Sequence, residues 1–173
     1  AEIGLLKSLA HLNLWSSNLR GTIPTEMGRL SSLKSLKIGV NATLEGTLPT
    51  EMGLLTSLEQ VVLCSNNLEG SIPTEIGHLT TLKDVVLWDN KLEGTIPTEI
   101  GFLTSLTALQ LYNNANMSGR VPTELANLSD LELLVLYGTR MSGSIPSSLC
   151  SSVTPEIDCD VIECTCCKDC IIQ

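Results

Sequence analysis

Leucines recur along this chain every 24 or 25 residues and mark the starts of six similar units. The six starting positions are Leu9, Leu33, Leu58, Leu82, Leu106 and Leu131. Each unit contains a short stretch with alternating faces, as in residues 85–88, where Val85 and Leu87 are predicted to point inward and Trp88 outward. One such strand cannot bury its apolar face alone. The pattern therefore predicts six parallel strands stacked over a common core.

A second recurring phrase, Gly-Thr-Ile-Pro-Thr-Glu, occurs at residues 21–26 and 94–99, and variants of it occur at residues 46–51, 70–75, 119–124 and 143–148. Threonine is a good helix N-cap, and glutamate suits the first turn because the helix dipole favours an anion there. A glycine four residues after the proline keeps the segment short. We therefore expect a helical turn or a 3-10 segment on the side opposite the strands.

An asparagine follows the strand in each of the four middle units, and a serine or threonine replaces it in the first and last. The positions are Asn41, Asn66, Asn90 and Asn114, with Ser17 and Thr139 at the ends. A buried amide there can satisfy the backbone groups of neighbouring units where the chain turns. The sequence thus predicts an asparagine ladder that ties the middle units more firmly than the end units.

These residues together carry a resemblance to a known repeat. The unit reads Leu82-x-x-Val85-x-Leu87-x-x-Asn90-x-Leu92-x-Gly94-x-Ile96-Pro97. It resembles the leucine-rich repeat, and its Gly-x-Ile-Pro segment is similar to the plant subclass found in receptor kinases, receptor-like proteins and polygalacturonase inhibitors. The resemblance implies an α/β solenoid: a right-handed superhelix with parallel strands on the concave face, helical or 3-10 segments on the convex face and a cysteine-rich C-terminal cap. It also implies a non-catalytic module that binds a protein, peptide or glycan.

The same phase divides the chain into three parts. Residues 1–8 match the end of a preceding repeat, residues 9–149 hold six repeats, and residues 150–173 form the expected cap. An initiator methionine is lacking, and we interpret the chain as a fragment of a longer protein.

The net charge and the sequence motifs argue against several classes of function. The net charge is −9, and the ten basic residues are scattered, which argues against nucleic acid as a partner. No apolar run approaches the roughly 20 residues that a membrane helix needs. His11 is expected on an outward strand position and His78 on the convex side, so the two cannot share a site. We expect no enzyme activity, no cofactor and no metal.

The two tryptophans and two tyrosines all fall at one outward position of the repeat. That column reads Trp15, Gly39, Cys64, Trp88, Tyr112 and Tyr137. Aromatic residues are enriched at binding interfaces, so we predict a ligand-binding strip on the concave face. Its residues are Trp15, Val62, Val86, Trp88, Tyr112, Leu133, Val135 and Tyr137. The alternative is that stacked aromatic rings only stiffen the sheet.

Six of the seven cysteines lie in the tail, at Cys150, Cys159, Cys164, Cys166, Cys167 and Cys170. An even number is consistent with three disulfides of unknown pairing in an oxidising compartment. A zinc site in residues 164–170 is an alternative. Cys64 stands apart and is expected to be a free, partly exposed thiol.

Three sequons favour an extracellular or cell-surface location: Asn41-Ala-Thr43, Asn116-Met-Ser118 and Asn127-Leu-Ser129. Asn41 is the weakest of the three because it is also a ladder residue.

Two other functions remain open. Hydroxyl rows at Thr22, Thr47, Ser71 and Thr95 and at Thr25, Thr50, Thr74, Thr98 and Thr123 could bind an ice or polysaccharide lattice. The terminal Cys-Ile-Ile-Gln, residues 170–173, fits a prenylation signal and would make the chain a lipid-anchored cytosolic scaffold.

Overall fold

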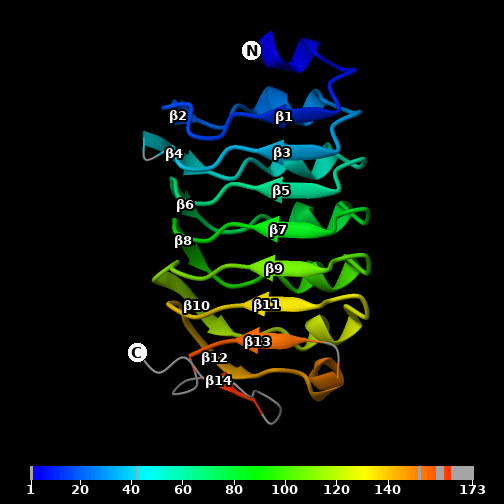
Figure 1. Ribbon diagram of the computed structural model, residues 1–173, viewed down its shortest axis with the longest axis vertical. Helices are drawn as coiled ribbons and strands as arrows, with labels where there is room; N and C mark the ends of the chain where they lie inside the picture. The colour runs from blue at the N-terminus through cyan, green and yellow to red at the C-terminus, as the bar shows by residue number, and fades with distance from the viewer. Residues whose placement is uncertain (1, 42, 152, 159–161, 165–173) are drawn as a thin grey trace.

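The chain winds into a stack of similar coils, each with one strand in each of two parallel sheets (Figure 1). The computed structural model describes residues 2–41, 43–151, 153–158 and 162–164. The first sheet contains the six expected strands within these residues: β1 (His11–Asn13), β3 (Ser35–Lys37), β5 (Gln60–Val62), β7 (Asp84–Val86), β9 (Ala108–Gln110) and β11 (Leu133–Val135). A seventh strand, β13 (Thr154–Glu156), which the sequence did not predict, extends it into the expected cap. Equivalent residues of successive coils lie side by side, as with Gln60 beside Asp84.

A second sheet runs along the stack, and the sequence reasoning did not foresee it. Its strands, from one end to the other, are β2 (Arg20–Thr22), β4 (Thr43–Thr47), β6 (Asn67–Gly70), β8 (Lys91–Gly94), β10 (Asn116–Arg120), β12 (Arg140–Ser144) and β14 (Ile162–Glu163). All are short, and the six from β2 to β12 contain the glycine of the Gly-x-Ile-Pro phrase, which is a poor strand former by itself. Gly70 has a φ of +71°, and a β-carbon on it would lie 2.8 Å from the γ-methyl of Thr47.

The expected short helical segments are present as 3-10 helices. They are η1 (Glu2–Leu5), η2 (Thr25–Arg29), η3 (Thr50–Leu54), η4 (Thr74–His78), η5 (Thr98–Phe102), η6 (Thr123–Asn127) and η7 (Ser147–Ser151). The expectation of a threonine N-cap is wrong. The extended residue Pro49 takes the cap position of η3 with no side-chain cap bond, while the Thr50 hydroxyl donates to the Glu51 carboxylate at 3.4 Å. A proline before the helix is already extended, so the threonine moves into the first turn.

Glycine allows these helices to stack closely. A β-carbon on Gly53 would lie 2.6 Å from the β-carbon and 2.7 Å from the carbonyl oxygen of Glu75 in the next coil. Real β-carbons essentially never come so close, so a larger residue would push the coils apart.

The core between the sheets is a continuous column of leucine, isoleucine, valine and methionine side chains. None of the five aromatic residues belongs to it. The four ladder asparagines are its buried polar members, with Asn114 fully buried. The Asn66 side-chain amide donates to the carbonyl oxygens of Ile38, Leu63 and Cys64 at 2.7, 2.9 and 3.1 Å, and its oxygen accepts from the Asn41 amide at 3.1 Å. The predicted ladder is confirmed.

None of the helices in the described ranges is long and apolar enough to cross a membrane. Cys164 is disulfide-bonded. The side chains of the other five tail cysteines, and with them the zinc alternative and the Cys-Ile-Ile-Gln signal, lie outside the described residues.

Candidate functional site: the outward face of the first sheet

The aromatic column lies on the outward face of the first sheet, just past the ends of the strands. Trp88, Tyr112 and Tyr137 come from three successive coils and are half-buried. Their rings stack: the centroids of Trp88 and Tyr112 are 5.2 Å apart with planes 10° from parallel, and those of Tyr112 and Tyr137 are 4.8 Å apart at 22°. The sheet spacing of about 4.8 Å imposes this stacking, because equivalent residues are held one strand apart.

Stacking decides which part of each ring is available to a ligand. The middle ring, Tyr112, has both faces covered by its neighbours, so solvent meets its edge and hydroxyl group. The edge of an aromatic ring is electropositive and its face electronegative. The stack thus offers edges and polar tips to a ligand, and flat faces only at its two ends.

Trp15 is separated from this stack. It is 45% exposed, and its indole ring lies against Gly39 of the next coil. Gly39 and Cys64 occupy the two intervening positions of the column. The sequence alignment placed the four rings in one row, and the structure divides them into a group of three and a single ring.

Three outward residues are buried, which corrects the sequence-based expectation of an exposed strip. Val62 is 9% exposed, Val135 is 3% exposed and the Cys64 thiol is 1% exposed. Val62 lies between Lys37 and Val86 on the adjacent strands, and Val135 lies beside Gln110 and Glu156. Val86 and Leu133 are half-buried and remain accessible at the surface.

Burial raises the pKa of two ionisable groups in this column. It raises the pKa of the Cys64 thiol above its ordinary value, and the Asp89 carboxylate raises this pKa further. Burial also raises the pKa of Tyr112, with smaller contributions from Tyr137 and Cys64. Burial therefore favours the neutral form of both groups.

A polar hollow of about 360 Å³ lies on the same sheet, across its N-terminal coils. Its walls are formed by His11, Lys34, Ser35, Lys37, Glu59, Gln60, Lys83 and Asp84. The sequence reasoning did not single it out. One row of its residues, His11, Ser35, Gln60 and Asp84, occupies outward strand positions that the sequence pattern indicates. The other row, Lys34, Glu59 and Lys83, lies just before the strands, where the pattern gives no signal.

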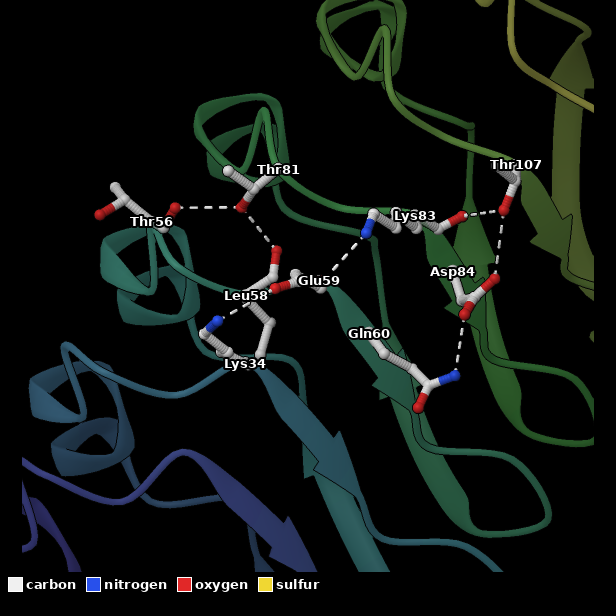
Figure 2. Close-up of polar contacts among 9 residues, drawn as sticks. All are labelled: Lys34, Thr56, Leu58, Glu59, Gln60, Thr81, Lys83, Asp84 and Thr107. Atoms are coloured by element: carbon white, nitrogen blue, oxygen red, sulfur yellow. Dashed lines mark hydrogen bonds and ion pairs between the residues drawn. The ribbon is translucent and has the colours of Figure 1, made fainter.

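Two ladders of polar contacts cross the hollow from coil to coil (Figure 2). In the first, the Glu59 carboxylate lies between two ammonium groups, 3.6 Å from Lys34 and 3.0 Å from Lys83. The hydrogen bond from Lys83 and the two positive charges lower the pKa of Glu59.

In the second ladder, the Gln60 side-chain amide donates to the Asp84 carboxylate at 2.8 Å. The Thr107 hydroxyl donates to the other oxygen of Asp84 at 3.4 Å. The Ser35 hydroxyl donates to Gln60 at 3.3 Å and extends the row by one coil. Both acidic groups of the hollow are therefore already engaged by protein partners.

The predicted glycosylation sites separate clearly by exposure. Asn41, the weakest of the three predicted acceptors, is 1% exposed, and its side chain bonds to the backbone of two coils. Asn116 and Asn127 are both exposed, on β10 and at the end of η6 respectively. Neither lies on the outward face of the first sheet.

Comparison with known proteins agrees with the fold. The Leucine Rich Repeat family model matches residues 57–79. The ectodomain of the Arabidopsis thaliana receptor kinase GASSHO1/SCHENGEN3, solved in complex with CASPARIAN STRIP INTEGRITY FACTOR 2, is 36% identical over 90% of this chain, with a TM-score of 0.84. The plant peptide hormone receptor RGFR1, solved in complex with RGF2, is 39% identical over 88%, with a TM-score of 0.81. No curated protein sequence matches significantly.

The repeat, the two sheets and these similarities identify the chain as a leucine-rich repeat protein of the type found in plant receptor ectodomains. The chain spans only 19% and 26% of the length of those two receptor structures. A plant ice-binding protein has the same fold: it is 28% identical over 80% of this chain and 47% of its own, with a TM-score of 0.69.

Proposed function

We propose that this chain is a non-catalytic recognition module that binds an extended protein or peptide segment along the outward face of the first sheet, the concave face expected from the sequence. The observation that carries the proposal is the aromatic stack. The three rings lie at the surface, although the core beneath them contains no aromatic residue. Aromatic rings held rigidly at a surface are typical of binding hot spots.

The stack also strengthens the sheet, because neighbouring aromatic rings on adjacent strands stabilise each other by about 0.5–1.5 kcal/mol. This contribution does not compete with binding. A row of rings that is already ordered loses little side-chain entropy when a partner binds. The half-buried Val86 and Leu133 supply apolar surface beside it, and Trp15 provides a separate anchor at the N-terminal end.

We further propose an extracellular or cell-surface location. The disulfide at Cys164, the exposed sequons at Asn116 and Asn127 and the similarity to receptor ectodomains support it. Glycans at these two asparagines would leave the outward face of the first sheet open to a partner.

Selection from a displayed library of random dodecapeptides tests the binding proposal. Peptides that bind the native chain should lose at least tenfold in affinity for Trp88→Ala. They should change less than twofold for Leu54→Ala, which removes an equally apolar, 61% exposed side chain from the opposite side. Failure to select any binder, or equal binding by Trp88→Ala, contradicts the proposal.

The hydroxyl row on the second sheet supports a second candidate, binding to an ice lattice. Thr22, Thr47, Ser71 and Thr95 are all exposed and one strand apart. The γ-methyls of Thr22 and Thr47 lie close to Gly46 and Gly70 of the next coil. Arg120 interrupts the row in the following coil, so it spans four coils only. Thermal hysteresis that disappears in Thr47→Lys would establish this function, and its absence in the native chain excludes it.

A further inference from the structure

The polar hollow contains positive charge that the protein itself does not neutralise. Glu59 is shared by Lys34 and Lys83, and Asp84 is held by Gln60 and Thr107. The Lys37 ammonium, in contrast, forms no ion pair or side-chain hydrogen bond among the described residues. Its neighbours on the adjacent strands are Asn13 and Val62, neither of which can carry a charge.

The position of Lys37 makes its ammonium group available for pairing with a ligand. The residue is half-buried at the end of β3, the second strand of the first sheet, and it lines the hollow. With Lys34 and Lys83 beside it, the hollow is lined by three lysines and two carboxylates. This is a local positive excess on a chain whose net charge is −9.

Resting on the proposed function, we infer that this hollow binds an acidic side chain, aspartate or glutamate, of the same extended peptide that lies along the aromatic stack. The peptide crosses the strands from coil to coil. Its carboxylate pairs with Lys37, and the following residues run across the ring edges of Trp88, Tyr112 and Tyr137. A carboxylate next to an unpaired ammonium in a partly desolvated hollow gains a charge-assisted bond, which is stronger than a neutral hydrogen bond.

The distances along the sheet agree with one continuous peptide. Lys37 belongs to the second coil and Tyr137 to the sixth, so four strand spacings of about 4.8 Å separate them, roughly 19 Å. An extended chain covers about 3.3 Å per residue. Six residues are therefore enough to connect an acidic side chain in the hollow to the far end of the stack.

Ring geometry favours a peptide over a sugar chain. Sugar rings pack on aromatic faces, and the faces of Tyr112 are covered by its two neighbours. The exposed ring edges are electropositive and attract carbonyl oxygens, which a peptide backbone presents at every residue.

Two conservative substitutions with opposite expected effects test this inference. The probe is a blocked octapeptide of alternating glutamate and valine, measured by isothermal titration and by NMR shifts, with the glutamine–valine octapeptide as its neutral counterpart. Lys37→Gln should weaken binding of the acidic peptide at least fivefold. Glu59→Gln, which frees Lys34 and Lys83 from their shared carboxylate, should strengthen it at least threefold. Lys91→Gln, an exposed lysine on β8 in the second sheet, is the matched control and should change binding less than twofold.

The outcomes separate this inference from the proposed function. If both octapeptides bind equally and lose affinity in Trp88→Ala, the face binds peptides and the acidic preference is wrong. If neither binds and library selection also fails, the recognition function itself is wrong. Binding of polygalacturonate with the same dependence on Lys37, and no binding of the acidic octapeptide, would overturn the peptide assignment in favour of an acidic glycan.

Discussion

The indole ring of Trp15 occupies the space in which any residue larger than glycine at position 39 would place its β-carbon. The two residues hold equivalent positions in neighbouring coils, and the Ser16 amide donates to the Gly39 carbonyl at 2.9 Å. Gly39 is consequently buried although it faces outward. The position of the Trp15 ring thus requires that residue 39 of the next coil has no side chain.

Gly39→Ala is expected to displace the Trp15 ring and to lower the free energy of unfolding by about 1–3 kcal/mol, the usual cost of overpacking. Tryptophan fluorescence in a Trp88→Phe background, where Trp15 alone reports, should shift to longer wavelength. An unchanged spectrum together with unchanged stability would show that the ring does not depend on this contact.

Asn66 and Asn67 are adjacent in sequence but differ in environment, and their alanine variants should differ accordingly. Asn66→Ala leaves three carbonyl oxygens and the Asn41 amide without their side-chain partner. Since each unpaired buried group costs about 1–3 kcal/mol, we expect a loss of about 3 kcal/mol or more. Asn67→Ala, at a half-exposed position, should cost less than about 0.5 kcal/mol. Urea denaturation of the two variants checks this, and equal losses would refute the ladder's role.

Val40 is the one β-branched residue among those with positive φ in the described coils, at +58°. The equivalent positions hold serine, aspartate, asparagine or glycine, which tolerate this conformation better. Val40→Asn should therefore stabilise the chain by about 1 kcal/mol. The converse substitution, Asn113→Val at a φ of +56°, should destabilise it by a similar amount. Melting temperatures that move in the same direction for both variants would contradict this explanation.

The Cys64 thiol should resist alkylation in the folded chain because it is buried and its pKa is raised. At pH values below the ordinary thiol pKa, the buried neutral thiol makes its full contribution to the stability of the folded chain. As pH rises from there towards the higher pKa of the folded state, that contribution is progressively lost, because the unfolded chain ionises first. Iodoacetamide labelling at pH 8, followed at Cys64 by peptide mass spectrometry, should be at least tenfold slower in buffer than in urea. Equal rates would place the thiol at the surface.

Secretion from a eukaryotic host should yield glycans at Asn116 and Asn127 and none at Asn41. The first two are exposed, whereas the side-chain nitrogen of Asn41 donates to the carbonyl oxygens of Leu14 and Gly39 at 3.2 and 2.9 Å. Glycopeptide mass spectrometry measures occupancy at each site. Modification of Asn41 would require its coil to open. A high glycan occupancy at Asn41 would therefore show that its side chain is not buried in the asparagine ladder of the secreted chain.

Several features follow from the sequence because they depend on residues within one repeat. The leucine period predicts the stacked strands and their inward side chains, and the asparagine after each strand predicts the buried ladder. The alignment of Trp88, Tyr112 and Tyr137 in one column also follows, since each lies at the same distance from its leucines.

Other features depend on the size of side chains about 24 residues away, in the neighbouring coils. Exposure is the clearest case: Val62 and Val86 occupy equivalent outward positions, yet only Val62 is buried. The pairing of Glu59 with Lys34 and Lys83 likewise joins residues of three successive coils.

The sequence alone determined the period of the stack, the direction in which each strand residue points and the identity of the buried amides, because these are set by backbone geometry within one unit. Only the tertiary structure decided the second sheet, the grouping of the rings and the charge balance of the hollow. These properties arise where successive coils meet, since hydrogen bonds between strands, ring stacking and ion pairs are formed across coils and not within them.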